Sequence, residues 1–183
     1  MKFDNVIVSK KSHEDGDVYA IVRSNLTVVN LLRDEAVPDE SVCDEALMSY
    51  WVDYYLAQCN NGGTSQFVYN TRWLPSIVEN VRAGLERIAG PDSQQLALFR
   101  ALEGRVASLG KAKLEAFFKG DYFGANEARD FLKDSSFFDV DKVEPLVVLN
   151  AKWLRGLPNL SVLDIDDMFA EIERTLGRTV SRS

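Results

Sequence analysis

The chain has very few of the residues that carry metal and thiol chemistry: two cysteines and one histidine among 183 residues. Cys43 and Cys59 fall at opposite ends of one predicted helix, where a rise of about 1.5 Å per residue separates them too widely for a disulfide. We expect both thiols to be reduced and buried. His13 stands alone in a polar stretch, so no set of ligands has the spacing of a zinc site. We predict no metal and no cofactor.

Long apolar runs and catalytic motifs are also missing. No stretch approaches the roughly 20 residues of a membrane-spanning helix, and the opening MKFDNVIVSKK lacks the apolar block of a signal peptide. We therefore expect a cytoplasmic protein with no membrane partner. Gly62-Gly63 is not followed by the Lys-Ser/Thr of a phosphate-binding loop, and no nucleophile elbow is present. The sequence gives no positive case for an enzyme, and we assign no catalytic residue.

Basic residues are missing from one long segment. The formal net charge is −7, and between Asp34 and Thr71 there are seven acids but no Lys or Arg. The remaining 21 acids equal the 21 basic residues in number, so this segment holds the whole imbalance. A local negative field repels nucleic-acid phosphates and attracts basic partners, which argues against direct nucleic-acid binding. The seven acids are Asp34, Glu35, Asp39, Glu40, Asp44, Glu45 and Asp53.

Apolar residues recur at helical spacing along most of the chain. We predict an all-α or nearly all-α fold, a single-domain bundle of about seven to nine helices over residues 1–183, with one short β pair between 6–8 and 160–163. Residues 9–17 and 134–141 are predicted to be connecting loops. The helices are predicted from Val18 to Leu32, Ser41 to Cys59, Thr64 to Asn70, Pro75 to Ala89, Asp92 to Leu109, one ending at Gly120, Asn126 to Lys133, Pro145 to Arg155 and Asp164 to Leu176.

The helix from Ser41 to Cys59 should organise the fold, because its apolar residues occupy too many faces for a surface helix. Ser41 with Asp44 has the spacing of a capping box at its start, as Asp92 with Gln95 has for a later helix. At its end, the run Asn60-Asn61-Gly62-Gly63 predicts a left-handed turn, because Asn tolerates positive φ and Gly adopts it freely. Thr64 or Ser65 is then expected to cap the next helix.

The residues around this turn resemble the signature of the DNA-mimic protein nineteen-like family. They are Asp53-Tyr54-Tyr55, Asn61-Gly62-Gly63, Gln66-Phe67 and Tyr69-Asn70, within residues 50–70. A fainter similarity runs from near Val18 to about Gly90, and Thr64 departs from the aromatic that usually follows the double Gly. The resemblance implies a mostly helical domain. The family is named for a member proposed to imitate DNA and sequester a transcription factor.

Two uses of the signature remain open. Asp53, Asn61, Gln66 and Tyr69 would form a polar pocket for a small molecule or substrate if their side chains converged. Alternatively, Asn61, Gly62, Gly63, Gln66 and Asn70 serve only to fix the turn, since Asn and Gly at a helix end already have a sufficient local cause. Asp53 among aromatic residues is then a carboxylate satisfied inside the fold.

The acidic segment has a functional and a structural interpretation as well. Duplex DNA carries one negative charge per about 1.7 Å of axis, so a mimic must hold its carboxylates in a dense and rigid row. Glu40 and Asp44, one helical turn apart, together with Asp34, Glu35, Asp39 and Glu45, would supply such a row, and a homodimer would double it. The partner would be the basic surface of a transcription regulator. Alternatively, these acids only interact favourably with the helix dipole and keep the protein soluble.

Overall fold

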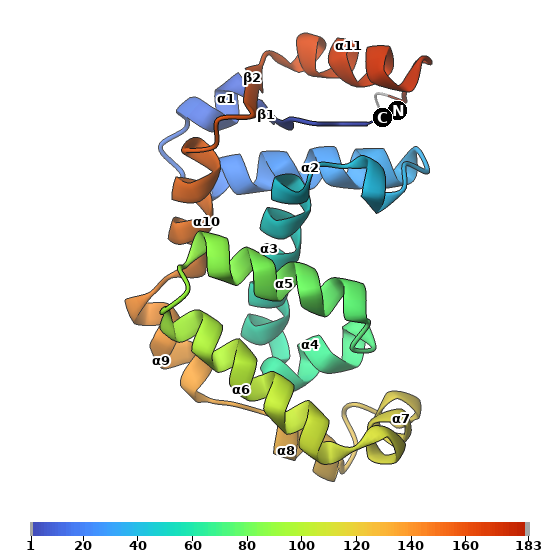
Figure 1. Cartoon of the computed structure of the whole chain (residues 1–183), viewed down its shortest axis with the longest axis vertical. Coiled ribbons are helices and arrows are strands. Elements are labelled where there is room, and N and C mark those ends of the chain that lie inside the picture. Colours follow the sequence, from blue (N-terminus) through green and yellow to red (C-terminus); the bar gives the residue numbers. More distant parts are fainter. Residues whose placement is uncertain (1, 182–183) are drawn as a thin grey trace. The chain divides into compact units, whose positions relative to one another are not determined.

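The computed structural model (Figure 1) describes residues 2–181, and they are mostly helical with one short parallel β pair. This confirms the predicted fold class and the predicted pairing of 6–8 with 160–163. In chain order the elements are β1 (Val6–Ser9), α1 (Lys10–Glu14), α2 (Tyr19–Asp34), the 3-10 turn η1 (Asp39–Ser41), α3 (Asp44–Gly62), α4 (Thr64–Thr71), α5 (Pro75–Ile88), α6 (Gln94–Leu109), α7 (Lys111–Lys119), α8 (Glu127–Leu132), α9 (Ser136–Val143), α10 (Leu146–Arg155), β2 (Leu160–Leu163) and α11 (Ile165–Leu176).

Two short helices, α1 and α9, lie where loops were predicted, which brings the described residues to eleven α-helices. The Ser9 side chain caps α1 by accepting a hydrogen bond from the Ser12 N–H. Within α9, Phe137 is fully buried and forms part of an aromatic cluster. A local cap explains the first helix and tertiary burial explains the second, and neither leaves a periodic pattern over so few residues.

The chain divides into two compact units. Unit 1 comprises the residues up to Tyr50 and those from Val147 onward, and unit 2 comprises Trp51–Leu146. The division falls within α3. A single domain remains a prediction.

In unit 1, β1 is buried along its whole length and pairs in parallel with β2, with Val6 opposite Leu160 and Ser9 opposite Leu163. Helices α2 and α11 both contact β1 (Figure 1). Parallel strands require a crossover connection, and here almost the entire chain forms it. The β pair therefore ties the two ends of the described sequence into one unit.

The start of α3 differs from the prediction. Ser41 is not the N-cap, because it ends the 3-10 turn η1, and α3 begins only at Asp44. Between them Val42 is extended and forms a parallel bridge with Phe3, whose N–H donates to the Ser41 carbonyl at 2.7 Å. Pairing and burial of Val42 hold the backbone extended where a helix was expected.

The end of α3 also differs. Asn60, Asn61 and Gly62 remain helical, and only Gly63 has positive φ, at φ 80° and ψ 179°. Gly63 is the N-cap of α4, so neither Thr64 nor Ser65 caps this helix. Thr64 is instead buried, and its hydroxyl donates to the Leu132 carbonyl at 2.7 Å and accepts from the Asp134 N–H at 3.0 Å. Because these longer-range hydrogen bonds use the Thr64 hydroxyl, it does not cap the helix.

The next capping box was also wrong. Ser93, not Asp92, is the N-cap of α6, and its side chain accepts from the Leu96 N–H. Gln95 is buried and donates through its side chain to Asp141 and to the Glu144 carbonyl. The Gln95 side chain therefore links α6 to the end of α9 and does not take part in a capping box at the start of α6.

An aromatic cluster forms the core of unit 2. The fully buried Tyr55 of α3 meets Phe67, Phe99 and Phe137 edge to face, with ring centroids 5.1, 5.3 and 5.7 Å away. This arrangement suits the aromatic quadrupole. The Tyr55 hydroxyl has no hydrogen-bond partner among the described residues. Burial, aided by the neighbouring Cys59 thiol, raises the pKa of Tyr55 well above its usual value.

Candidate functional site

The first candidate site is the acidic junction, which we define as the acidic residues from Asp34 to Glu45 that connect α2 to α3 in unit 1. Helix α2 ends in a Schellman motif: the Ala36 N–H donates to the Arg33 carbonyl and the Val37 N–H donates to the Leu32 carbonyl. Ala36 holds the left-handed conformation that glycine usually supplies, with φ 58°. This motif fixes Asp34 and Glu35 at the end of α2.

Two of the six acids are neutralised by arginines. Arg33 contacts Asp39 through two hydrogen bonds, of 3.1 and 3.0 Å. Arg178, from the segment after α11, forms an ion pair with Glu35 and donates to the Glu35 carbonyl at 2.8 Å. The Glu35 side chain is only 13% exposed. Neither residue therefore offers a free carboxylate to a partner.

The remaining acids are arranged differently. Asp34, Glu40 and Asp44 are exposed and make no ion pair with any described residue. Glu45 is half-buried and accepts a hydrogen bond from the Asn159 side chain at 3.3 Å. Glu40 and Asp44 are not one turn apart on the same helix. Glu40 lies in η1 and Asp44 begins α3, with the extended Val42 between them. The exposed carboxylates of the acidic junction that make no ion pair with the described residues are thus those of Asp34, Glu40 and Asp44.

The second candidate site is the signature corner, which we define as Gln58 to Asn70 in unit 2. Gln66 and Asn70 converge there: the side-chain amides of both donate to the Gln58 side-chain oxygen, at 3.0 and 2.6 Å. Gly62 makes room for this contact, since a Cβ at that position would lie 1.9 Å from Gln66 Oε1. Gly62 is required for space, whereas Gly63 is required for its backbone conformation.

The structure does not bring all the predicted pocket residues together. Asp53 is buried, while Asn61, two turns further along α3, is exposed. The Tyr69 hydroxyl donates to the Gly120 carbonyl at 2.9 Å, away from the amide cluster. Gln66 and Asn70 are the members that meet, and their common partner Gln58 was not among the predicted residues. Gln58 and Gln66 are eight residues apart and lie on two different helices, so no helical spacing in the sequence indicated their contact.

The loop after α7 is tied to the signature corner by a tyrosine. The Tyr122 hydroxyl donates to the Gly62 carbonyl at 2.9 Å and lies 3.1 Å from the Ser65 hydroxyl. Arg129 donates to the carbonyls of Tyr122 and Gly124, on both sides of Phe123, at 3.0 Å each. The corner therefore acts as an anchor for residues 120–124.

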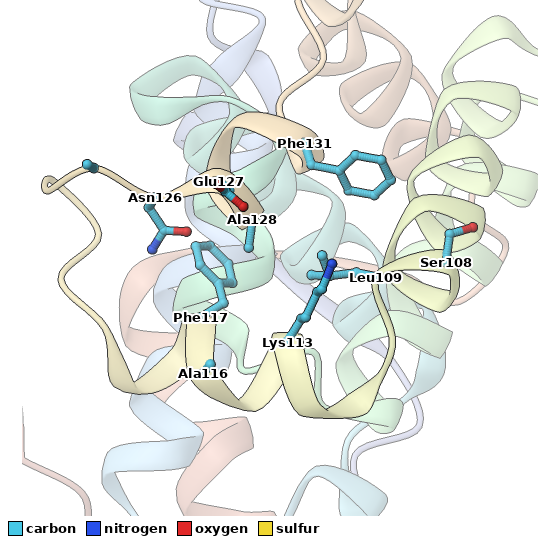
Figure 2. A pocket seen from close by; sticks show the side chains of 10 residues that line it. Ser108, Leu109, Lys113, Ala116, Phe117, Asn126, Glu127, Ala128 and Phe131 are labelled. Carbon is cyan, nitrogen blue, oxygen red and sulfur yellow. The ribbon is translucent and has the colours of Figure 1, made fainter.

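A pocket of about 700 Å³ lies beside this loop, and we call it the α6–α8 pocket (Figure 2). The signature residues do not line it. Six of its ten lining residues are apolar, and the other four have polar or charged side chains. Its lining comprises Ser108, Leu109, Lys113, Ala116, Phe117, Ala125, Asn126, Glu127, Ala128 and Phe131.

Both cysteines are free and buried, as predicted. Burial raises the pKa of Cys43 to about 11 and raises that of Cys59 further, so neither thiol ionises readily near neutral pH. Across residues 2–181, no three His, Cys, Asp or Glu side chains are grouped to hold a metal ion. In the same range, no helix is long and apolar enough to cross a bilayer.

These features define a mostly helical protein with exposed acids between α2 and α3 and a glycine corner that organises the packing of its neighbours. The model of the DMP19-like protein family matches residues 40–157, more than half of the chain, so this chain belongs to the DMP19-like protein family. The match begins later and runs further than the similarity over 18–90. Neither the curated proteins nor the solved structures gave a match.

The matched region includes the signature corner and the α6–α8 pocket, but not the whole acidic junction. Glu40, Asp44 and Glu45 fall inside it, whereas Asp34, Glu35 and Asp39 precede it. Both arginines that neutralise acids of the junction, Arg33 and Arg178, also lie outside the matched range.

Proposed function

We propose that this protein is a non-enzymatic, cytoplasmic interaction protein that uses the acidic junction to occupy the basic surface of a DNA-binding regulator. The observation that carries this proposal is the exposure of Asp34, Glu40 and Asp44 in a segment without basic residues. Membership of a family named after a DNA mimic agrees with it.

The physical basis is electrostatic competition. A DNA-binding surface is built to attract phosphates, and carboxylates that are already unpaired need not give up a partner to bind it. Three exposed carboxylates are fewer than the six that the sequence suggested, so we infer a smaller contact. A homodimer would present two such sets and bring the charge closer to that of two DNA strands.

The test compares two variants with equal changes of charge. Asp34→Asn/Glu40→Gln/Asp44→Asn removes the exposed, unpaired acids of the junction. Glu14→Gln/Glu86→Gln/Asp92→Asn removes three exposed acids elsewhere that likewise make no ion pair within residues 2–181. Each variant and the wild type are titrated against a DNA-binding regulator recovered from the native lysate, at low and at physiological salt.

We expect the junction variant to bind about tenfold more weakly at low salt, because three exposed charge pairs contribute roughly 0.2 to 1 kcal/mol each. The control variant should bind like the wild type, and salt should weaken the wild-type complex because the Debye length is about 10 Å at 0.1 M. Equal losses in the two variants would mean that net charge alone matters. Unchanged binding of the junction variant would reject this surface.

A further inference from the structure

The α6–α8 pocket has the size and lining of a small-molecule site. Its volume of about 700 Å³ lies within the roughly 300 to 1,000 Å³ of typical ligand pockets, which combine apolar walls with a few polar groups. Phe117 is almost fully buried at this site, while Phe131 is 48% exposed. Water therefore contacts apolar wall that a ligand with an apolar body would cover.

The floor of the pocket is held in place by the signature corner. The Phe117 ring contacts those of Tyr69 and Tyr122, with centroids 5.2 and 6.3 Å away. Both tyrosines are fixed through their hydroxyls, Tyr69 on the Gly120 carbonyl and Tyr122 on the Gly62 carbonyl. A wall fixed in advance lowers the cost of ordering on binding.

The polar groups at the pocket favour an anionic head. Lys113 lines the pocket (Figure 2) and makes no ion pair or hydrogen bond with the described residues. The Asn126 Oδ1 accepts from the Arg129 N–H at 3.0 Å, so its side-chain NH₂ is the group left to donate. The Ser108 hydroxyl is already used on the Gly104 carbonyl. Glu127 is the single acid of the lining and would repel an anion placed next to it.

We propose that the α6–α8 pocket binds a small amphipathic carboxylate, whose apolar body covers Phe131 beside the buried Phe117 and whose carboxylate meets the ammonium of Lys113. This inference does not depend on the acidic junction, which lies in the other unit. It assigns a ligand site to a place that the sequence did not indicate.

Decanoate and decyltrimethylammonium are suitable probes, because they share an apolar chain and carry opposite charges. Each is titrated by calorimetry into the wild type and into Lys113→Met, which keeps the length of the side chain and removes its charge. Lys111→Met is the matched control, since Lys111 starts the same helix, is 91% exposed and does not line the pocket. Ala128→Trp fills the cavity, with circular dichroism to verify its fold.

We expect saturable binding of decanoate with a Kd of about 1 mM or below, the affinity typical of a ligand of this size. Lys113→Met should weaken it about fivefold, Lys111→Met should leave it unchanged, and a folded Ala128→Trp should abolish it. Decyltrimethylammonium should bind at least about fivefold more weakly than decanoate.

Four outcomes of these titrations would overturn the assignment. They are the absence of saturable decanoate binding, equal affinity of Lys113→Met and wild type, equal losses in Lys113→Met and Lys111→Met, and equal or tighter binding of the cationic probe. Self-association that Ala128→Trp abolishes, without any response to decanoate, would also overturn it. In that case the exposed Phe123 of a second copy would be the occupant.

Discussion

Alanine substitutions at the two adjacent glycines of the signature corner should have different effects, because the two residues are required for different reasons. Gly63 has φ 80° and ψ 179°, a region that is essentially limited to glycine and costs other residues about 1 to 3 kcal/mol. Alanine recovers about 0.4 to 1 kcal/mol by restricting the unfolded chain. Gly63→Ala should therefore lower the free energy of unfolding by about 1 to 2 kcal/mol.

Gly62 is the last residue of α3, where alanine is favoured over glycine by at most about 1 kcal/mol. The new Cβ would displace the Gln66 side chain, whose end is flexible, and so break its hydrogen bond to Gln58, which contributes a similar amount. Gly62→Ala should therefore be close to neutral. In a Gln66→Ala background this bond and the two closest contacts are absent, but the Cβ of residue 66 stays 3.0 Å from the new Cβ, so the same change should stabilise the protein by less than about 1 kcal/mol.

Urea unfolding followed by circular dichroism measures all four variants. The reasoning would be refuted if Gly63→Ala were as stable as the wild type, because the positive φ would then carry no cost. It would also be refuted if Gly62→Ala changed the free energy of unfolding by the same amount with and without the Gln66 side chain, because displacement of that side chain would then have no effect.

Two further predictions concern buried polar groups. Tyr55→Phe should raise the free energy of unfolding by up to about 1 kcal/mol in urea, because it removes a buried hydroxyl with no oxygen or nitrogen partner among the described residues, beside the weakly bonding Cys59 thiol; a loss would show that the contact with the thiol stabilises the fold. The pKa of Asp134 is lowered: burial alone would raise it, but hydrogen bonds from Ser136 and the charge of Arg105 outweigh that. Asp134 therefore stabilises the fold above about pH 4 and loses this effect as the pH falls through its folded pKa. Asp134→Asn should cost about 1 kcal/mol at pH 7 and less near pH 2 in urea titrations, and a constant difference would contradict this assignment.

The sequence predicts elements well where the cause is local and periodic. Helices α5, α10 and α11 lie close to their predicted positions, and Gly63 does terminate α3. Predictions failed where a distant residue decides the local structure. Phe3 holds Val42 extended and so displaces the predicted cap at Ser41, and Leu132 captures the hydroxyl of Thr64.

The candidate sites show the same limit. The acidic segment contains no basic residue, yet Arg33 immediately before it and Arg178 far after it fold onto two of its acids. The α6–α8 pocket draws its wall from three helices and a loop, so no single motif encodes it. Asn61 suggested a turn by its residue type, but the backbone of α3 passes through it as a helix.

The contact between Arg178 and Glu35 makes the charge of one surface depend on a segment that follows the last helix. A cut, a fused tag or a bound protein that drew Arg178 away would uncover one carboxylate and one backbone carbonyl next to Asp34. The position chosen for a label or an affinity tag would therefore affect the negative charge of the surface around Asp34 and Glu35, and with it the attraction of that surface for cationic molecules.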